Sequence, residues 1–270
     1  MSHELTLSDD DVIPLDIIAE RVIGLQILFV NLFAISAKDG SWVLVDTGLR
    51  HAGDRIRRWV LEKFPANPAP LAIILTHGHF DHVGTVRELA EEWDVPVYAH
   101  QRELPYLTGD KSYPDPDPSV GGGAMARLSF LYPQEPIDLG GRVRALPEDG
   151  SVPGLTGWLA IPTPGHTEGH IVLFREQDGL LIGGDAFCTT KNESLVSVMT
   201  QKPELSGPPK YFTPDWKGAK ESMERMARLE PAILAPSHGL PMRGKDAIVA
   251  FQELTERFDE LAKPEQGKYV

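Results

Sequence analysis

A short segment near the middle of the N-terminal half carries an unusual density of metal-binding side chains. Its sequence is THGHFDH, in which His77, His79, Asp81 and His82 lie within six residues. Imidazole nitrogens and carboxylate oxygens are typical ligands of zinc and related divalent ions. An apolar run, LAIIL, precedes the segment and has the composition of a buried strand. The spacing favours a metal site in the turn after this strand, with His77 and His79 on one ion and Asp81 and His82 facing a second.

Three further candidate ligands also follow apolar runs. They are His166 in TPGHTEGH, Asp185 in LIGGDAF and His238 in APSHG. Each of these runs reads as a strand, so converging strand ends would bring all the candidates to one place. Seven such ligands exceed the needs of one tetrahedral ion and suit two ions. Two ions that share a carboxylate, roughly 3.5–4 Å apart, are a known hydrolytic arrangement.

The elements that must position these ligands alternate between strands and helices. Apolar patterning predicts strands over 25–35, 41–46, 71–76, 95–100, 157–163 and 232–237, and a hairpin with an Asp-Gly turn over 170–185. Helical spacing predicts helices over 53–64, 83–93, 214–229 and 245–263, the third of them capped by Thr213 and Pro214. Two segments rich in proline and glycine, 108–136 and 189–214, read as long irregular loops of the kind that form lids or binding walls. We therefore expect a single layered α/β domain over residues 1–270.

Composition and charge limit the class of protein. The 270 residues are 41% hydrophobic and 24% charged, as in globular chains. A formal net charge of −13 disfavours nucleic-acid binding, which needs lysine and arginine to contact phosphates. Cys188 is the single cysteine, so no intrachain disulfide can form. The N-terminal residues do not resemble a signal peptide, and the longest apolar stretch, 22–35, is too short to span a bilayer.

These limits predict a cytoplasmic protein whose partner is a small-molecule substrate, with neither nucleic acid nor membrane among its partners. The oligomeric state is left open by the sequence, and a homodimer is compatible with it.

The motifs together resemble those of the metallo-β-lactamase superfamily. THGHFDH is similar to the metal-binding signature of that family, and His166, Asp185 and His238 follow in the family's order. VLVDTG at 43–48 and TPGHTEGH at 163–170 match two further family motifs. The resemblance extends from about Leu25 to His238 and leaves no ligand position vacant.

The resemblance implies a four-layer αββα sandwich with a dinuclear site, usually of zinc, with manganese or iron as other divalent ions that would suit it. The first ion would be held by His77, His79 and His166. The second ion would be held by Asp81, His82 and His238, and Asp185 would bridge the two.

The family also implies a mechanism and two supporting residues. A hydroxide between the ions would be the nucleophile, because metal coordination lowers the pKa of water from about 15.7 to near 7. Asp81 would orient this hydroxide or carry a proton. Asp46 of VDTG and His170 would lie behind the ligands and orient them.

The substrate is not selected by the resemblance, because the family hosts many reactions. Hydroxyacylglutathione hydrolases share TPGHTEGH, but this chain departs from them after Asp185 and has Gly-Leu after His238. Acyl-homoserine lactonases share the ligand set, but Cys188 stands where they place a tyrosine, and Tyr211 is a candidate to take the role of that tyrosine.

The remaining prediction is a hydrolase of a small ester, thioester, lactone or phosphoester. A di-iron oxidoreductase-type domain is the alternative from another class. Substrate-binding residues are not assigned, and Cys188, Tyr211 and Trp216 are open candidates for the pocket wall.

Overall fold

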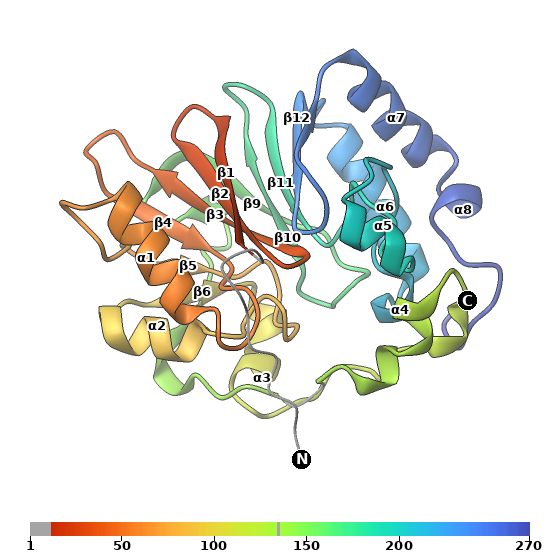
Figure 1. The fold of residues 1–270 in the computed structure, drawn as a ribbon, viewed down its shortest axis with the longest axis horizontal. Helices are drawn as coiled ribbons and strands as arrows, with labels where there is room; N and C mark the ends of the chain where they lie inside the picture. Colours follow the sequence, from red (N-terminus) through yellow and green to blue (C-terminus); the bar gives the residue numbers. More distant parts are fainter. Residues whose placement is uncertain (1–11, 134–135) are drawn as a thin grey trace.

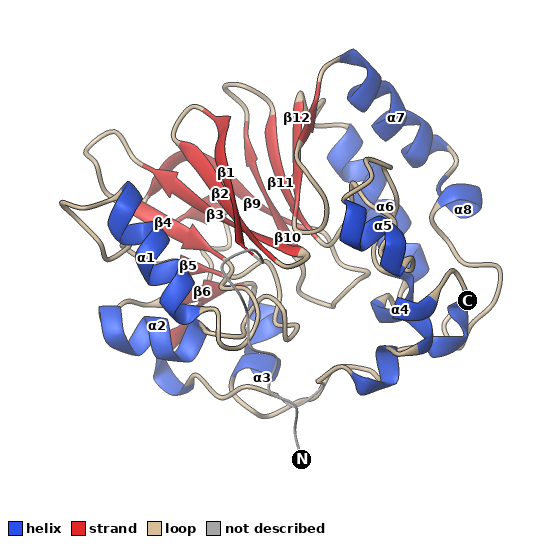
Figure 2. Ribbon diagram, in the orientation of Figure 1, coloured by secondary structure: helices blue, strands red, loops and turns tan. Residues whose placement is uncertain are grey.

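Two β-sheets pack face to face, and helices cover the outer face of each. A computed structural model describes residues 12–133 and 136–270 of the chain. Figure 1 shows α1 and α2 outside one sheet and α6 and α7 outside the other, and Figure 2 shows the strands gathered between the helices. The predicted αββα sandwich is therefore confirmed.

The first sheet is built from the N-terminal half of the chain, and its strands lie side by side in sequence order. They are β1 (Val12–Ala19), β2 (Val22–Ile27), β3 (Val30–Ser36), β4 (Trp42–Val45), β5 (Ile73–Ile74), β6 (Val97–Ala99) and β7 (Val143–Ala145). Pairing is antiparallel from β1 to β4 and parallel from β4 to β7. Parallel neighbours need crossover connections, and α1 (Gly53–Lys63) and α2 (Val86–Trp93) lie in two of them.

The second sheet has the strand order β13-β12-β11-β10-β9-β8. Its strands are β8 (Ser151–Val152), β9 (Leu155–Pro162), β10 (Ile171–Arg175), β11 (Leu180–Gly184), β12 (Ile233–Pro236) and β13 (Met242–Arg243). β11 and β12 are parallel, and their crossover contains α5 (Leu195–Thr200) and α6 (Trp216–Ala227). The chain then continues through α7 (Lys245–Glu256) and α8 (Phe258–Leu261).

Strand β3 illustrates how the core is divided between the layers. Leu32 and Ala34 point into the cluster that includes α1 and α2, whereas Phe33 and Ile35 point into the cluster between the two sheets. Side chains alternate between the faces of a strand, so a strand buried on both faces reads as a continuous apolar run. A third cluster joins the outer face of the second sheet to α6, α7 and α8.

The two long segments contain short helices rather than entirely irregular chain. Segment 189–214 contains α5 and η6 (Lys210–Phe212). Segment 108–136, of which residues 134–135 lie outside the described part, contains η3 (Pro118–Val120), α4 (Ala124–Arg127) and η4 (Ser129–Leu131). The remaining short helices are η2 (Gln101–Glu103), α3 (Leu104–Leu107) and η5 (Gly140–Arg142). Within the described ranges, every helix is too short or too polar to cross a bilayer.

The single strand predicted over 25–35 is wrong. The chain turns back at Leu28 and Phe29, so that β2 and β3 form an antiparallel hairpin in which Ile27 faces Val30. Leu28 adopts a left-handed backbone conformation, with φ of 57°. Glycine or asparagine usually marks such a turn, and an apolar turn residue left no signal in the sequence.

Several predicted element bounds also differ from the structure. Strand 71–76 shortens to β5, and the helix predicted from residue 83 begins at Val86. α6 begins after Asp215, whose carboxylate accepts a hydrogen bond from the Gly218 N–H at 2.9 Å, and not at the predicted Thr213–Pro214 cap. The helix predicted over 245–263 is divided at Arg257 into α7 and α8.

Candidate metal centre

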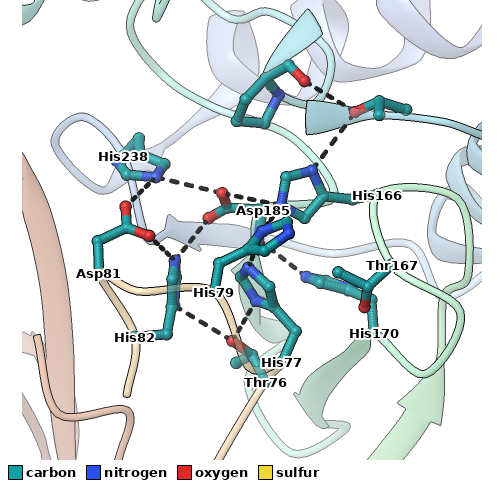
Figure 3. A network of polar contacts seen from close by, with 12 residues as sticks. Thr76, His77, His79, Asp81, His82, His166, Thr167, His170, Asp185 and His238 are labelled. Carbon is teal, nitrogen blue, oxygen red and sulfur yellow. Dashed lines mark hydrogen bonds and ion pairs between the residues drawn. The ribbon is translucent and has the colours of Figure 1, made fainter. Parts of the chain in front are cut away.

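The candidate ligands converge at one end of the sandwich, from four connections that follow strands. His77, His79, Asp81 and His82 lie between β5 and α2, and the other three follow strands of the second sheet. These three are His166 after β9, Asp185 after β11 and His238 after β12. All seven side chains are buried, and Figure 3 shows them facing one another.

The first ligand group consists of His77, His79 and His166, whose candidate ligand atoms all lie within 4.8 Å of one another. The Nδ1 atom of His79 lies 3.0 Å from Nε2 of His77 and 2.9 Å from Nε2 of His166. This is the set expected for the first ion, with two ligands from one sheet and one from the other.

The second ligand group consists of Asp81, His82 and His238, which the structure also brings within 4.8 Å. Asp185 lies between the two groups (Figure 3). One of its oxygens, Oδ1, is 3.3 Å from Nε2 of His82, and the other, Oδ2, is 3.2 Å from Nε2 of His238. The Oδ2 atom is also 3.4 Å from Nε2 of His166, so Asp185 has the position of a bridging carboxylate.

Hydrogen bonds on the far side of two imidazoles define which nitrogen carries the proton. The Nδ1 atom of His82 is 2.9 Å from Oδ2 of Asp46, and Nδ1 of His238 is 2.9 Å from the carbonyl oxygen of Phe29. Both partners are acceptors, so each Nδ1 is the donor. The Nε2 lone pair of each ring is then free to face the centre, which is the usual arrangement for a metal-binding histidine.

Two threonine hydroxyls define the protonated nitrogen of His77 and His166 in the same way. The hydroxyl of Thr76 donates to Asp46 at 2.8 Å and therefore accepts from Nδ1 of His77 at 3.2 Å. The hydroxyl of Thr213 donates to a main-chain carbonyl at 2.8 Å and accepts from Nδ1 of His166 at 3.4 Å. Nε2 of His77 and Nε2 of His166 then present lone pairs to the same point.

Bound metal ions would satisfy the inward-facing atoms of these side chains better than hydrogen bonds among them do. Among the described residues, the buried atoms Nε2 of His82 and Oδ1 of Asp185 have no hydrogen-bond partner, although buried polar atoms are nearly always paired. The converging lone pairs of His77 and His166 cannot donate to each other. A cation would satisfy all of these atoms together.

Burial and neighbouring charges give the two groups different electrostatic character. Burial disfavours the charged imidazolium, and it lowers the pKa of His79 to about 3 and the pKa values of His77 and His166 well below the usual value. Burial also opposes a charge on His82, but the carboxylates of Asp185 and Asp81 outweigh it and raise the pKa of His82 well above its usual value. The first group is therefore neutral at pH 7. In the second group the carboxylates favour a proton on Nε2 of His82 when no ion is bound, and a cation would take the place of that proton.

The two residues predicted to support the ligands lie directly behind them. The Asp46 carboxylate accepts hydrogen bonds from the Thr76 N–H at 2.8 Å and from His82. His170 accepts the main-chain N–H of Asp185 on Nε2 at 2.9 Å, while its Nδ1 lies 2.8 Å from the Thr163 hydroxyl. Each residue thus contacts a proposed ligand without facing the centre.

Glu103 is a buried residue beside the centre that the sequence did not reveal. Its carboxylate accepts hydrogen bonds from the Gly78 N–H at 3.2 Å and the Gly169 N–H at 2.9 Å, and from the hydroxyls of Tyr113 and Thr167. These contacts join the turn that carries His77 and His79 to the loop that carries His166. The local sequence HQREL has no motif that would have indicated this role.

A small cavity lies against the metal centre and has a volume of about 20 Å³. Tyr211 lines it, as the sequence left open, together with Asp81, Asp185 and His238. Trp216 packs instead among the buried residues of α6, α7 and the second sheet.

Cys188 is fully buried next to this cavity but is not among the residues that line it. Its sulfur accepts a hydrogen bond at 3.0 Å from Asn192, and the Asn192 side chain forms part of the cavity wall.

Comparisons with known proteins identify the family of this chain. A family model described as the metallo-beta-lactamase superfamily matches residues 26–238. The probable metallo-hydrolase YflN of Bacillus subtilis (strain 168) is 45% identical over 245 residues, covering 90% of this chain and 93% of its own. The probable metallo-hydrolase YybB of the same organism is 32% identical, covering 75% of this chain and 78% of its own.

Solved structures show the same fold. A beta-lactamase domain protein from Burkholderia ambifaria has a TM-score of 0.62 with 22% identity and covers 95% of this chain and 79% of its own. TTHA1623, solved in a di-iron-bound form, has a TM-score of 0.54 with 27% identity and covers 80% of this chain and 90% of its own. With the family model matching most of the chain, this protein belongs to the metallo-β-lactamase superfamily.

Proposed function

We propose that this protein is a metal-dependent hydrolase that uses two divalent ions, with zinc as the first candidate, to cleave a small ester, thioester, lactone or phosphoester. The observation that carries the proposal is the convergence of seven buried ligand-type side chains, among which Nε2 of His82 and Oδ1 of Asp185 have no hydrogen-bond partner. When bound, such an ion pair supplies a hydroxide nucleophile at neutral pH and polarises the oxygen of the scissile group.

The seven candidate ligands would hold the two ions. His77, His79 and His166 would hold one ion, and Asp81, His82 and His238 the other. Asp185 contacts both groups and would bridge them.

Asp81 is the residue we assign to proton handling. Its Oδ2 is 3.5 Å from Nε2 of His238, and the residue also lines the cavity where a substrate would enter. Asp81 would orient the attacking oxygen and pass its proton to the leaving group.

Metal analysis of freshly purified protein combined with hydrolysis assays tests this proposal. We expect about two metal ions per chain and hydrolysis of at least one of four substrates: a p-nitrophenyl ester, a thioester, a lactone and bis-p-nitrophenyl phosphate. A folded preparation that binds no zinc, manganese or iron after supplementation would reject the proposal.

Ligand variants test the assigned roles. His77→Ala and Asp185→Asn should lower hydrolysis by orders of magnitude, because each removes a metal contact. His51→Ala, at an exposed turn position, and Asp39→Asn, in the turn between β3 and β4, are the matched controls and should retain activity. Unchanged turnover in either ligand variant would refute its role.

A di-iron centre with oxidoreductase activity is the second candidate, favoured by the di-iron-bound form of TTHA1623. Iron as the dominant metal, with oxygen consumption and without hydrolysis of the four substrates, would support it over the hydrolase.

A further inference from the structure

The cavity beside the metal centre is polar on one side and mostly apolar on the other. The residues Asp81, Asp185 and His238 form the side that faces the proposed ions. Most of the remaining wall is apolar or aromatic and includes Phe29, Phe80, Met125, Tyr132, Val198 and Phe212. Within the described part of the chain, neither lysine nor arginine lines this cavity.

Part of this apolar wall belongs to a hydrophobic cluster that is separate from the three main cores. It is formed by Tyr211 and Phe212 of η6 with residues of the first long segment, and Phe80 packs against it from the metal-binding turn. The rings of Phe80 and Tyr132 are stacked with centroids 5.5 Å apart. Because Phe80 lies between His79 and Asp81, the apolar surface begins directly at the ligands.

Exposed apolar side chains also occur on both long segments. Phe130 is 63% exposed and Met199 is 76% exposed, and the set also includes Leu128, Leu131, Leu195 and Val196. The two segments meet, because Gly122 and Gly123 lie against Glu193 with no room for a side chain. The Glu193 carboxylate also accepts the Lys210 N–H at 3.0 Å. The cavity is therefore bordered by two connected segments that both expose apolar residues.

A substrate bound here must bury its non-reacting part against this wall. An anionic group placed against the apolar part of the wall, away from the proposed ions, would lose its hydration without a cationic side chain to compensate, which is costly. An apolar chain would gain about 0.8 kcal/mol for each buried methylene. The cavity of about 20 Å³ holds one water-sized molecule, so the side chains of Met125 and Val198 must move to admit a chain.

We propose that the preferred substrates are neutral carboxylic esters, thioesters or lactones with an extended apolar acyl group. This inference rests on the proposed hydrolase function and narrows its substrate class. The scissile carbonyl would face Asp81, Asp185 and His238, and the acyl chain would pass Phe80 and Met125 toward the rim. Water adds across the acyl C–O or C–S bond: the carbonyl carbon gains the new C–O bond, the leaving alcohol or thiol takes a proton, and the carboxylic acid product ionises.

A chain-length series tests the inference on the metal-loaded protein. The substrates are p-nitrophenyl acetate, hexanoate and decanoate, with S-lactoylglutathione and bis-p-nitrophenyl phosphate as anionic comparators. We expect kcat/KM to rise by about fourfold for each methylene that becomes buried, and to be lower for both comparators than for the decanoate. A flat or falling series, or a comparator that exceeds the decanoate, would overturn the substrate class while leaving the hydrolase function intact.

Variants locate the effect in the cavity wall. Met125→Ser and Val198→Ser should each lower the decanoate-to-acetate ratio of kcat/KM by about fifteenfold, which corresponds to the loss of roughly two buried methylenes. Val249→Ser, at an exposed position of α7, is the matched control and should leave the ratio unchanged. An unchanged ratio in both cavity variants would count against the proposal.

A binding measurement distinguishes failure of this inference from failure of the hydrolase function. Absence of turnover on every substrate would refute the hydrolase function. Decanoic acid, the product of the long ester, should still raise the Tm of the metal-loaded protein more than an equal concentration of acetic acid does. Equal shifts for the two acids would refute the apolar subsite itself.

Discussion

Residues behind the histidines determine which ring nitrogen of each histidine is free to bind a metal ion. Asp46, Thr76 and the carbonyl oxygen of Phe29 each contact the outer nitrogen of a histidine, so that the inner nitrogen presents its lone pair. Partners of this kind typically change metal affinity by about 10–100-fold.

Asp46→Asn tests this arrangement at one residue. Asp46 accepts from the Thr76 N–H, the Thr76 hydroxyl and His82, so an amide group would oppose one of these donors with a donor of its own. We expect the affinity for one metal ion to fall by about 10–100-fold, measured by chelator competition and metal content. Asp39→Asn, whose carboxylate bonds to Ser41 in an exposed turn, is the control, and equal affinities in the two variants would contradict the prediction.

Glu103→Gln is the second prediction at this scale. The carboxylate accepts hydrogen bonds from Gly78 and Gly169, and an amide cannot accept all of them. Leaving a buried donor unsatisfied costs about 1–3 kcal/mol, so the free energy of unfolding should fall by that amount in urea titrations. Because the two loops also carry His77, His79 and His166, the metal content should fall as well.

The control for Glu103→Gln is Glu91→Gln, which changes an exposed residue of α2. Full stability and full metal content in Glu103→Gln would show that the two loops hold their positions without this carboxylate.

At the scale of elements, the metal-binding turn packs tightly against the segment after β4, residues 48–50. The Gly84 N–H donates to the Gly48 carbonyl at 2.8 Å. A Cβ atom on Gly84 would lie 2.2 Å from the main-chain nitrogen of Arg50. The metal-binding turn can therefore pack this closely only because Gly84 has no side chain.

Gly84→Ala should displace this turn, because the clash is with main-chain atoms that cannot rotate away. Overpacking typically costs about 1–3 kcal/mol, and we expect a lower Tm together with weaker metal binding through Asp81 and His82. Gly141→Ala, where a Cβ atom would meet nothing within 4 Å, is the matched control. If Gly84→Ala has the same Tm as the control, the main chain around Arg50 moves to accommodate the added methyl group and the prediction is wrong.

At the scale of the whole molecule, the metal centre connects the two halves of the sandwich. The first sheet contributes His77, His79, Asp81 and His82, and the second contributes His166, Asp185 and His238. Bound ions would therefore link segments far apart in the sequence and stabilise the folded state by mass action.

Removal of metal should lower the Tm of the whole protein. A ligand present at 1,000 times its Kd stabilises by about 4 kcal/mol, and that contribution is lost when a chelator is added. Thermal unfolding followed by circular dichroism, with and without the chelator, measures the difference. In Asp185→Asn the chelator should have a smaller effect, and identical melting curves for the wild type in both conditions would refute the prediction.

The sequence alone determined the candidate ligands and the layered fold. Three histidines and an aspartate within six residues, directly after an apolar run, are typical of a metal site. The order of His166, Asp185 and His238 also matches a family pattern. Apolar periodicity identified α1 and the hairpin of β10 and β11, because these elements bury regular faces.

The tertiary structure alone decided how the ligands are held and what lies around them. The hairpin turn at Phe29 carries the carbonyl that contacts His238, yet its apolar residues concealed it within one continuous run. Glu103 and the apolar cavity wall depend on side chains that meet across more than 20 residues of sequence. Local periodicity reports which face of an element is buried, whereas these contacts arise only when separate elements pack together, and for that physical reason the sequence could not show them.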